Sequence, residues 1–278
     1  MRTMILLVVL VSVGALLAAP AMAQTARNSA MGEIGVGLAD DASAFVSNPA
    51  GLPTVTTFGQ SISPWPSRVS AVASVDAEWD RFGAWYTARN VDETTGWGAG
   101  YWRYDFDGLE IDTLGGGFGM AIGDSGFSAG INLINENQDV AMTATQDGAD
   151  LDSTFFDVGV MYQREDALAN RWRVGAVARD LSDESGVGPW YDVGASVTLP
   201  TGLIVGLDVL DVTEEIDAVV NLGAEFPIPM TDFLVRVGAI DGDPTAGFGY
   251  RRDNWEFSAS YQNLDAGDET AIGLTACF

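Results

Sequence analysis

From about residue 57 to its end, this chain consists mainly of short segments in which apolar residues occupy every second position. From Trp172 to Ala178, for example, Trp, Val, Ala and Ala alternate with Arg, Gly and Val. A period of two places successive side chains on opposite faces of a β-strand. Gly, Asp, Asn and Pro separate the segments, and residues 123–126 (Gly-Asp-Ser-Gly) are typical of a tight turn between two strands. The pattern predicts an all-β fold of antiparallel strands.

Fifteen such segments can be counted from residue 57 onward. The first, residues 57–63, is followed at once by Pro64 and Pro66, and proline is disfavoured in a strand ladder. Leaving it out gives fourteen strands, an even number as a single-chain bacterial barrel requires; twelve is the second choice. Short and long connections alternate along much of the chain, and the polar stretch 135–150 is interpreted as the longest loop. We therefore predict a transmembrane antiparallel β-barrel.

The composition combines strong acidity with an apolar average. The formal net charge is −26, yet the mean hydropathy is +0.13. An inside-out arrangement reconciles the two, with apolar side chains facing lipid and acids in loops, lumen and rims. The competing interpretation is an acidic, secreted, soluble β-sandwich.

The composition also excludes several functions. All 13 basic residues are arginines, and there is no lysine and no histidine. A polyanion of this size does not bind nucleic acid. The lack of histidine removes histidine metal sites and any Ser-His-Asp triad, so we expect no enzyme activity, no cofactor and no metal. Cys277 is the single cysteine, which gives no disulfide framework and is expected to be a small apolar residue at a strand end.

The first 23 residues have the features of a secretory signal. Arg2 precedes an apolar run over residues 5–19, and Ala21-Met22-Ala23 follows. This order predicts cleavage after Ala23 rather than a membrane-spanning helix. The mature chain would then begin at Gln24.

The aromatic residues favour contact with lipid. Tryptophans at or near the ends of candidate strands predict interfacial girdles. They are Trp79, Trp85, Trp97, Trp102, Trp172, Trp190 and Trp255. The last segment, residues 270–278, alternates and ends on Phe278 without a tail, which resembles the targeting signal read by the barrel-insertion machinery. Phe278 is the candidate membrane-insertion signal, and the expected location is the outer membrane of a bacterial cell, in contact with its lipid.

The stretch between the signal and the first strand, residues 26–53, is different because it is rich in Ala and Gly and does not alternate. Pro49 has no amide hydrogen and pushes Asn48 toward an extended shape, Asn48 can cap a local turn, and Gly51 can take a positive φ. These features predict a kinked plug inside the barrel; the alternative is a flexible linker. Asp40 and Asp41 are expected to cap a short helix within residues 40–47 or to be solvated, with cation binding as the third possibility.

Two groups of motifs carry a family resemblance, one near each end of the chain. Residues 26–32, 37–44 and 48–52 resemble the N-terminal signature of the superfamily that joins the long-chain fatty-acid transporter (FadL) group to the PorV/PorQ group, and residues 222–226, 235–238 and 245–250 resemble its PorV side. The resemblance implies an outer-membrane barrel, typically of fourteen strands, with an N-terminal hatch in the lumen. The division would be a signal peptide over 1–23, a hatch over 24–57 and a barrel over 58–278. The hatch or ligand-gating residues would be Asp40, Asp41, Asn48, Pro49, Ala50 and Gly51.

Three functions follow as hypotheses. The first is a channel or transporter for small hydrophobic compounds. The second is a PorV-like docking or shuttle barrel for secreted proteins, which needs external loops that bind a partner. The third is the acidic, secreted, soluble β-sandwich. The expected partners are outer-membrane lipid and the insertion machinery, together with hydrophobic small molecules in the first case or a secreted protein in the second.

Overall fold

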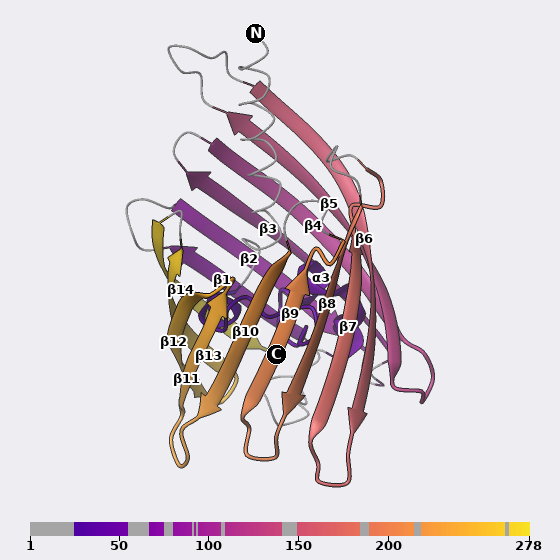
Figure 1. The fold of residues 1–278 in the computed structure, drawn as a ribbon, viewed down its shortest axis with the longest axis vertical. Helices are drawn as coiled ribbons and strands as arrows, with labels where there is room; N and C mark the ends of the chain where they lie inside the picture. The colour runs from indigo at the N-terminus through magenta and orange to yellow at the C-terminus, as the bar shows by residue number, and fades with distance from the viewer. Residues whose placement is uncertain are drawn as a thin grey trace.

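The computed structural model describes residues 25–54, 67–74, 80–90, 92, 94–106, 109–140, 149–183, 189–213, 218–264 and 267–278. Within these residues the chain forms one closed barrel of fourteen antiparallel strands, each paired with its neighbours in sequence, and β1 pairs with β14 (Figure 1). The predicted fourteen-strand barrel is confirmed. Twelve strands and the soluble sandwich are wrong, because one sheet closes on itself instead of stacking on a second.

The strands follow the alternating segments closely. They are β1 (Ser67–Ser74), β2 (Asp80–Arg89), β3 (Thr95–Phe106), β4 (Leu109–Ala121), β5 (Phe127–Val140), β6 (Ala149–Glu165), β7 (Arg171–Arg179), β8 (Trp190–Thr198), β9 (Ile204–Leu210), β10 (Val219–Pro227), β11 (Phe233–Ile240), β12 (Asp243–Arg252), β13 (Trp255–Leu264) and β14 (Gly267–Cys277). We call the rim where β1 begins and β14 ends the terminal rim, and the opposite one the far rim.

The barrel closes where the last residue meets the first strand. Phe278 and Ser67 exchange both backbone hydrogen bonds, at 3.0 and 3.1 Å, and the hydroxyls of Ser70 and Thr275 lie 2.7 Å apart across the same strand pair. Pairing of residues 68–74 with residues 271–277 leaves no free sheet edge at this seam. The ring of Phe278 is half-exposed on the outside, 6.3 Å from that of Tyr86. Its role as an insertion signal stays a prediction.

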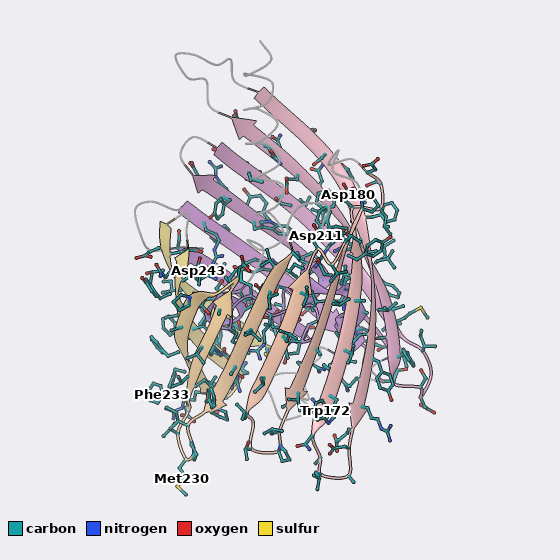
Figure 2. The ribbon with its side chains drawn as sticks, in the orientation of Figure 1. Trp172, Asp180, Asp211, Met230, Phe233 and Asp243 are labelled. Atoms are coloured by element: carbon teal, nitrogen blue, oxygen red, sulfur yellow. The ribbon has the colours of Figure 1, made fainter. Side chains whose placement is uncertain are left out.

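The outer face of the barrel is apolar and the inner face is polar. On β5, Phe127, Ile131 and Leu133 are exposed, whereas Ser128 and Asn132 between them are buried. This is the predicted inside-out arrangement. Near the terminal rim, exposed aromatic side chains lie at the beginning of several strands, and Figure 2 shows two of them, Trp172 and Phe233.

The prediction that the tryptophans form girdles is only partly right. Trp97, Trp172 and Trp255 are half-exposed on the outer face. Trp85, Trp102 and Trp190 are buried, because their positions in the alternation fall on the lumen side. Trp79 lies outside the described residues.

The wall of the barrel has unequal height. β4, β5 and β6 contain 13, 14 and 17 residues, whereas β9 contains 7, and in Figure 1 β2–β6 extend beyond the other strands at the top of the view. At roughly 3.3 Å per residue, β6 is about 30 Å longer than β9. The barrel therefore carries a projecting sheet on one side of its far rim.

The projecting sheet corrects the predicted loop at residues 135–150. β5 continues to Val140 and β6 begins at Ala149, so the strand pair covers half of that stretch, and residues 141–148 lie outside the described residues. The alternation continues in polar residues, with Glu136 and Gln138 buried on the inner face and Asn135 and Asn137 exposed on the outer face. A polar strand pair lacks the apolar period by which strands are recognised.

The connections at the far rim differ in length, from two residues to the ten residues, 180–189, between β7 and β8. Residues 107 and 108 alone separate β3 from β4, and residues 265 and 266 separate β13 from β14. The predicted alternation of short and long connections thus holds only in part. In the part of the chain that the structure describes, no helix is long and apolar enough to cross a membrane.

Candidate functional site: the plug and its two walls

The lumen is filled by residues 25–54, which we call the plug. It contains two short α-helices and one 3-10 helix: α2 (Ala26–Ala30), α3 (Ala44–Ser47) and η1 (Pro49–Thr54). Every residue from 25 to 53 is buried, so the flexible-linker alternative is wrong for this segment. α2 packs against β11–β14, and η1 packs against β2–β6 on the other side of the lumen. Small residues let the segment approach the wall closely.

The plug bends at Asn48. This residue is extended (φ −159°, ψ 105°), as the following proline requires. Its side-chain oxygen accepts from the Ala50 amide at 3.1 Å, and its side-chain nitrogen donates to the carbonyls of Val36 (3.0 Å) and Val160 (3.2 Å). Asn48 therefore closes the turn before η1 and ties two parts of the plug to β6. Pro49 opens η1.

Ala50 and Gly51 are constrained by contact. The Ala50 carbonyl accepts from the Ser128 hydroxyl at 2.7 Å. The expected positive φ of Gly51 is wrong. Five described glycines have a positive φ, and Gly51 is not one of them. A Cβ at position 51 would lie 2.5 Å from the Cβ of Ala39, so glycine is needed there for space.

Asp40 neither caps a helix nor faces solvent. Its carboxylate is buried and lies 2.6 Å from Nη1 of Arg27. Asp41 is buried too, and it accepts from the Ser43 amide at 2.9 Å just before α3. The helix is shorter than the predicted span of residues 40–47, because it begins only at Ala44.

Arg27 joins the plug to a network of buried charges on the barrel. Its Nε lies 2.9 Å from Glu225, which also pairs with Arg236 at 2.8 Å; Arg236 in turn lies 2.5 Å from Glu256. Burial opposes the charge of Arg27, but the carboxylates of Asp40 and Glu225 outweigh it and raise its pKa. A buried ion pair that loses one partner costs about 3–5 kcal/mol, so this network holds the beginning of the plug firmly.

Arg179 on β7 holds the middle of the plug. Its guanidinium pairs with Asp157 (3.1 Å) and Asp192 (2.8 Å) and donates to the carbonyls of Val46 (2.5 Å) and Ser47 (2.8 Å). Those carbonyls lie at the end of α3, where they have no partner within the helix. The planar donor fork of arginine satisfies both at once.

Asp208 on β9 holds the plug between Gly35 and Gly37. Its carboxylate accepts from three consecutive amides, those of Gly35 (2.6 Å), Val36 (2.7 Å) and Gly37 (3.1 Å). Consecutive amides that converge in this way form an anion-binding concavity. The sequence gave no hint of this contact, because Asp208 is one acidic residue among 39.

These contacts define an ionic wall, the lumen face of β6–β13. Its charged residues are Asp157, Arg173, Arg179, Asp192, Asp208, Glu225, Arg236 and Glu256, all buried. The opposite side of the lumen, the inner face of β2–β6, carries buried apolar side chains together with polar ones such as Arg81, Asn132 and Glu136. We call five of its large apolar side chains the apolar wall: Trp85, Trp102, Ile111, Ile134 and Phe155.

The plug meets the apolar wall through Phe45. The ring lies over four glycines, Gly98, Gly100, Gly115 and Gly117, which we call the glycine cradle; a Cβ at any of them would lie 2.9–3.1 Å from Phe45. The four form two directly opposed pairs between β3 and β4. The plug is thus held by ion pairs on one side of the lumen. On the other side Phe45 packs against bare backbone, and the plug carbonyls of Phe45 and Ala50 accept hydrogen bonds from Asn132 and Ser128.

The apolar wall contains polar atoms that lack hydrogen bonds. The indole nitrogens of Trp85 and Trp102 and the hydroxyl of Thr113 are buried and have no partner in the described part of the structure. Trp102 and Thr113 are register partners on β3 and β4. An apolar surface with a few convergent polar groups is the usual character of a site for small organic molecules.

The wall is thin at the cradle. On the outer face beside it lies an apolar hollow of about 500 Å³, lined by Gly116, Gly117, Phe118, Ile131, Asn132, Leu133 and Phe156. Gly116 faces outward and Gly117 inward, so only backbone separates this hollow from Phe45.

Fold and plug together define a class, a fourteen-strand β-barrel closed by its own N-terminal segment. A solved FadL homologue of Pseudomonas aeruginosa is similar to this chain, with a TM-score of 0.56, 10% identity, and coverage of 92% of this chain and 98% of that chain. A mutant porin of Rhodopseudomonas blastica aligns with a TM-score of 0.41 at 13% identity, over 76% of this chain and 98% of its own. No family model and no curated protein matches. At such identities the first likeness shows a shared fold, and it agrees with the resemblance seen in the sequence.

Proposed function

We propose that this chain is an outer-membrane channel for small hydrophobic compounds, in which the plug gates the passage. The observation that carries the proposal is the division of the lumen. The ionic wall holds the plug through Arg27, Arg179 and Asp208. On the side of the apolar wall the plug packs the side chains of Phe45 and Leu52 and accepts neutral hydrogen bonds from Ser128 and Asn132, with no ion pair at these contacts. An apolar compound can replace those two side chains against the apolar wall without breaking an ion pair.

The chemistry of the apolar wall fits an amphiphile. Trp85, Trp102 and Ile134 supply apolar surface, and the free indole N–H groups and the Thr113 hydroxyl supply donors for one polar end. Burying apolar surface contributes roughly 25 cal/mol per Å², which is enough to bind a small compound in water.

The hollow beside Gly116 offers a route into the bilayer. A compound at the glycine cradle is one backbone layer from an apolar, lipid-facing surface. In the proposed cycle, Phe45 leaves the cradle, the compound takes its place, and local opening between β4 and β5 releases it sideways.

The decisive experiment compares uptake of a labelled small hydrophobic compound and of a labelled sugar by cells with and without the chain. We expect faster uptake of the hydrophobic compound only. Gly116→Trp, which fills the outer hollow, should slow that uptake, whereas Val193→Trp on the outer face of β8 should not. Equal uptake in cells with and without the chain would refute transport.

The docking alternative has one supporting observation. The projecting sheet is polar on its outer face, where Asn135, Asn137 and Asp152 are exposed, so it offers a surface beyond the apolar band. Co-purification of one secreted protein with the wild-type chain, lost when Asn137 is replaced by Trp, would favour docking over transport.

A further inference from the structure

Glu136 on β5 is a buried carboxylate on the inner face of the projecting sheet, and it is 1% exposed. Among the described residues, its one hydrogen bond comes from the side-chain nitrogen of Gln138 at 2.6 Å, and no arginine pairs with it. A buried carboxylate is costly unless a cation or several hydrogen bonds accompany it. Glu136 therefore lacks the partner that its charge requires.

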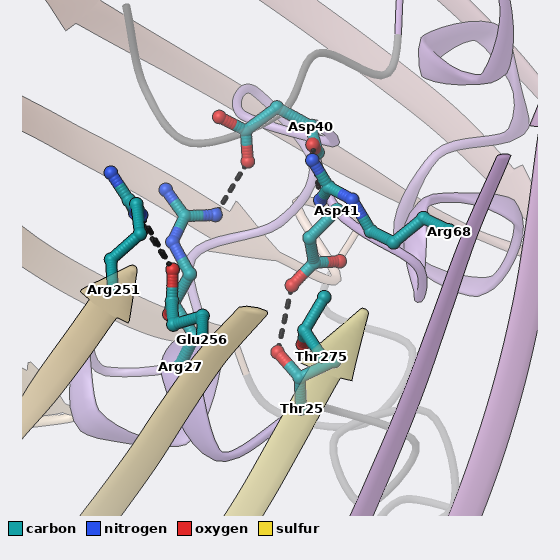
Figure 3. Close-up of a pocket in the computed structure, with 8 residues that line it drawn as sticks. All are labelled: Thr25, Arg27, Asp40, Asp41, Arg68, Arg251, Glu256 and Thr275. Carbon is teal, nitrogen blue, oxygen red and sulfur yellow. Dashed lines mark hydrogen bonds and ion pairs between the residues drawn. The ribbon is translucent and has the colours of Figure 1, made fainter. Parts of the chain in front are cut away.

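Two other buried carboxylates of the lumen show what such a partner looks like. Around the small cavity in Figure 3, Asp40 pairs with Arg27 at 2.6 Å and Glu256 pairs with Arg251 at 2.8 Å. Those carboxylates belong to the network that holds the plug to the ionic wall. Glu136 lies on the other side of the lumen and takes no part in that network.

Glu136 belongs to a group of polar side chains on neighbouring strands. Trp102 on β3 is the register partner of Thr113 on β4, and Thr113 is the register partner of Glu136. Directly opposed side chains on one face have their Cβ atoms about 5 Å apart. The indole nitrogen of Trp102, the hydroxyl of Thr113 and the side-chain oxygen of Gln138 are buried and have no hydrogen-bond partner among the described residues. We call these four side chains the polar cluster.

The polar cluster adjoins the glycine cradle. Thr113 lies two residues from Gly115 on β4, and Glu136 lies two residues from Ile134 on β5. A Cβ at position 115 would lie 3.1 Å from the ring of Phe45 and 3.5 Å from Ile134. Two residues of a strand span about 7 Å, so a compound that replaces the Phe45 ring has its other end at the polar cluster.

The polar cluster favours one kind of polar end. Glu136 and Gln138 present oxygens that accept hydrogen bonds, and the Thr113 hydroxyl accepts as well as it donates. An ammonium group has three donors, no acceptor and the positive charge that a buried carboxylate requires. A carboxylate end would be repelled by Glu136, and a hydroxyl end would bring no charge. Tryptophan, here Trp102, is also the side chain whose ring attracts a cation most strongly.

We propose that the compound bound at the apolar wall is a protonated hydrophobic amine, whose ammonium group pairs with Glu136 while its apolar part replaces the ring of Phe45. The inference rests on the proposed function, because it uses the same wall and the same displaced ring. The formal net charge of −26 adds a general attraction for cations and disfavours anionic amphiphiles.

The test measures binding to the purified, folded barrel in lipid nanodiscs by isothermal titration calorimetry. Three probes share a phenyl ring on two carbons and differ in the polar end: 2-phenylethylamine, 2-phenylethanol and 3-phenylpropanoate. Empty nanodiscs correct for partition into lipid, and high salt screens the overall charge of the chain. We expect the amine to bind about tenfold more tightly than the alcohol, and the propanoate to bind most weakly. This order of affinities is measured on the wild type and needs no variant.

Glu136→Gln should weaken binding of the amine about tenfold and leave binding of the alcohol unchanged. Glu165→Gln is the matched control, because it removes the same charge from an exposed residue at the end of β6, and it should change neither affinity. Heat-modifiable migration on a gel shows that each variant is folded. Equal affinity of wild type and Glu136→Gln for the amine would overturn the proposal. So would tighter binding of the alcohol or the propanoate, or no binding of the amine.

This proposal and the transport proposal fail in different ways. Binding of the amine through Glu136, without faster uptake by cells that contain the chain, would refute transport and support the amine site. Faster uptake of the alcohol and the amine alike, unchanged in Glu136→Gln, would support transport and refute the amine site.

Discussion

The side chain of Phe45 lies so close to Gly117 that a Cβ at position 117 would sit 2.9 Å from the Cβ of Phe45. The contact explains a run of glycines that the strand pattern leaves unexplained, since glycine weakens a strand interior unless another group approaches closely. It also makes the fit between plug and wall testable at single positions.

Replacing Gly117 with valine should loosen the plug. The added side chain faces the lumen and collides with Phe45, and overpacking of this kind costs about 1–3 kcal/mol. Protease sensitivity of residues 25–54 in the folded barrel measures the effect. Gly116→Val is the matched control, because Gly116 faces outward and a Cβ there would lie at an ordinary 3.5 Å from the nearest atom, the carbonyl oxygen of Gly98.

Phe45→Ala should have two effects. Loss of a buried phenyl ring costs about 3–5 kcal/mol. A Gly115→Val change should also become less harmful in the same chain, because the nearest atom to a Cβ at position 115 is Cε2 of the lost ring, at 3.1 Å. Additive losses of plug protection in the double variant would show that the two positions do not interact.

Asp208→Asn should free the segment from Gly35 to Gly37. The amide keeps one oxygen but brings an NH₂ group toward three N–H donors, so about 1.5–3 kcal/mol of charged hydrogen bonding is lost. Hydrogen exchange at the amides of Gly35, Val36 and Gly37 should accelerate, while that at β4 stays slow. If those three amides remain as protected as in the wild type, the Asp208 carboxylate does not hold this segment.

The strands could be predicted because a barrel wall has one face toward an apolar phase and the other toward a polar lumen. Apolar and polar residues therefore alternate along each strand with a period of two. The pattern fails where both faces are polar, as at Asn135 and Glu136 in the projecting sheet. The face to which a single side chain points cannot be predicted when the boundaries of its strand are uncertain. For this reason Trp85 and Trp102 were expected on the outer face, although both are buried in the lumen.

The plug could be located from its composition but not its bonds. Asn48 and Pro49 determine their own turn locally, so their geometry follows from the sequence. Arg179 meets Val46 across 133 residues, and nothing near either residue in the chain marks that contact. In an acidic chain without lysine, arginine could have pointed to residues that hold the plug. Six arginines are buried in the lumen: Arg27, Arg68, Arg81, Arg173, Arg179 and Arg236.

Arg179→Lys should weaken the plug although it keeps the charge. A lysine ammonium cannot reach two carboxylates and two carbonyls with the geometry of a planar fork. We expect more rapid proteolysis around Val46 and Ser47, with the barrel itself intact on a gel. Arg164→Lys is the control, because Arg164 is exposed on β6. If the two substitutions have the same effect, the guanidinium geometry at position 179 does not matter.

Protonation of Glu33 should make the plug more stable in acid. Glu33 lies in the plug, and burial raises the pKa of its carboxyl to about 7. The hydrogen bond from Gln262 and the charge of Arg81 lower this pKa, whereas the negative charge of Glu269 raises it further. The folded chain therefore binds this proton more tightly than the unfolded chain, whose value is 4.5. The stabilisation is complete below pH 4.5 and is lost as the pH rises through about 7.

Protease protection of the plug should accordingly fall between pH 4.5 and 7 in the wild type. Glu33→Gln removes the titrating group and keeps an acceptor for Gln262, so its protection should remain near the acid level across the same interval. A protease whose activity has been calibrated at each pH on the unfolded chain gives the comparison. If the protection of Glu33→Gln falls as much as that of the wild type, other carboxylates cause the pH dependence. Glu269, which pairs with Arg81 at 3.0 Å beside this site, would then be the next residue to replace.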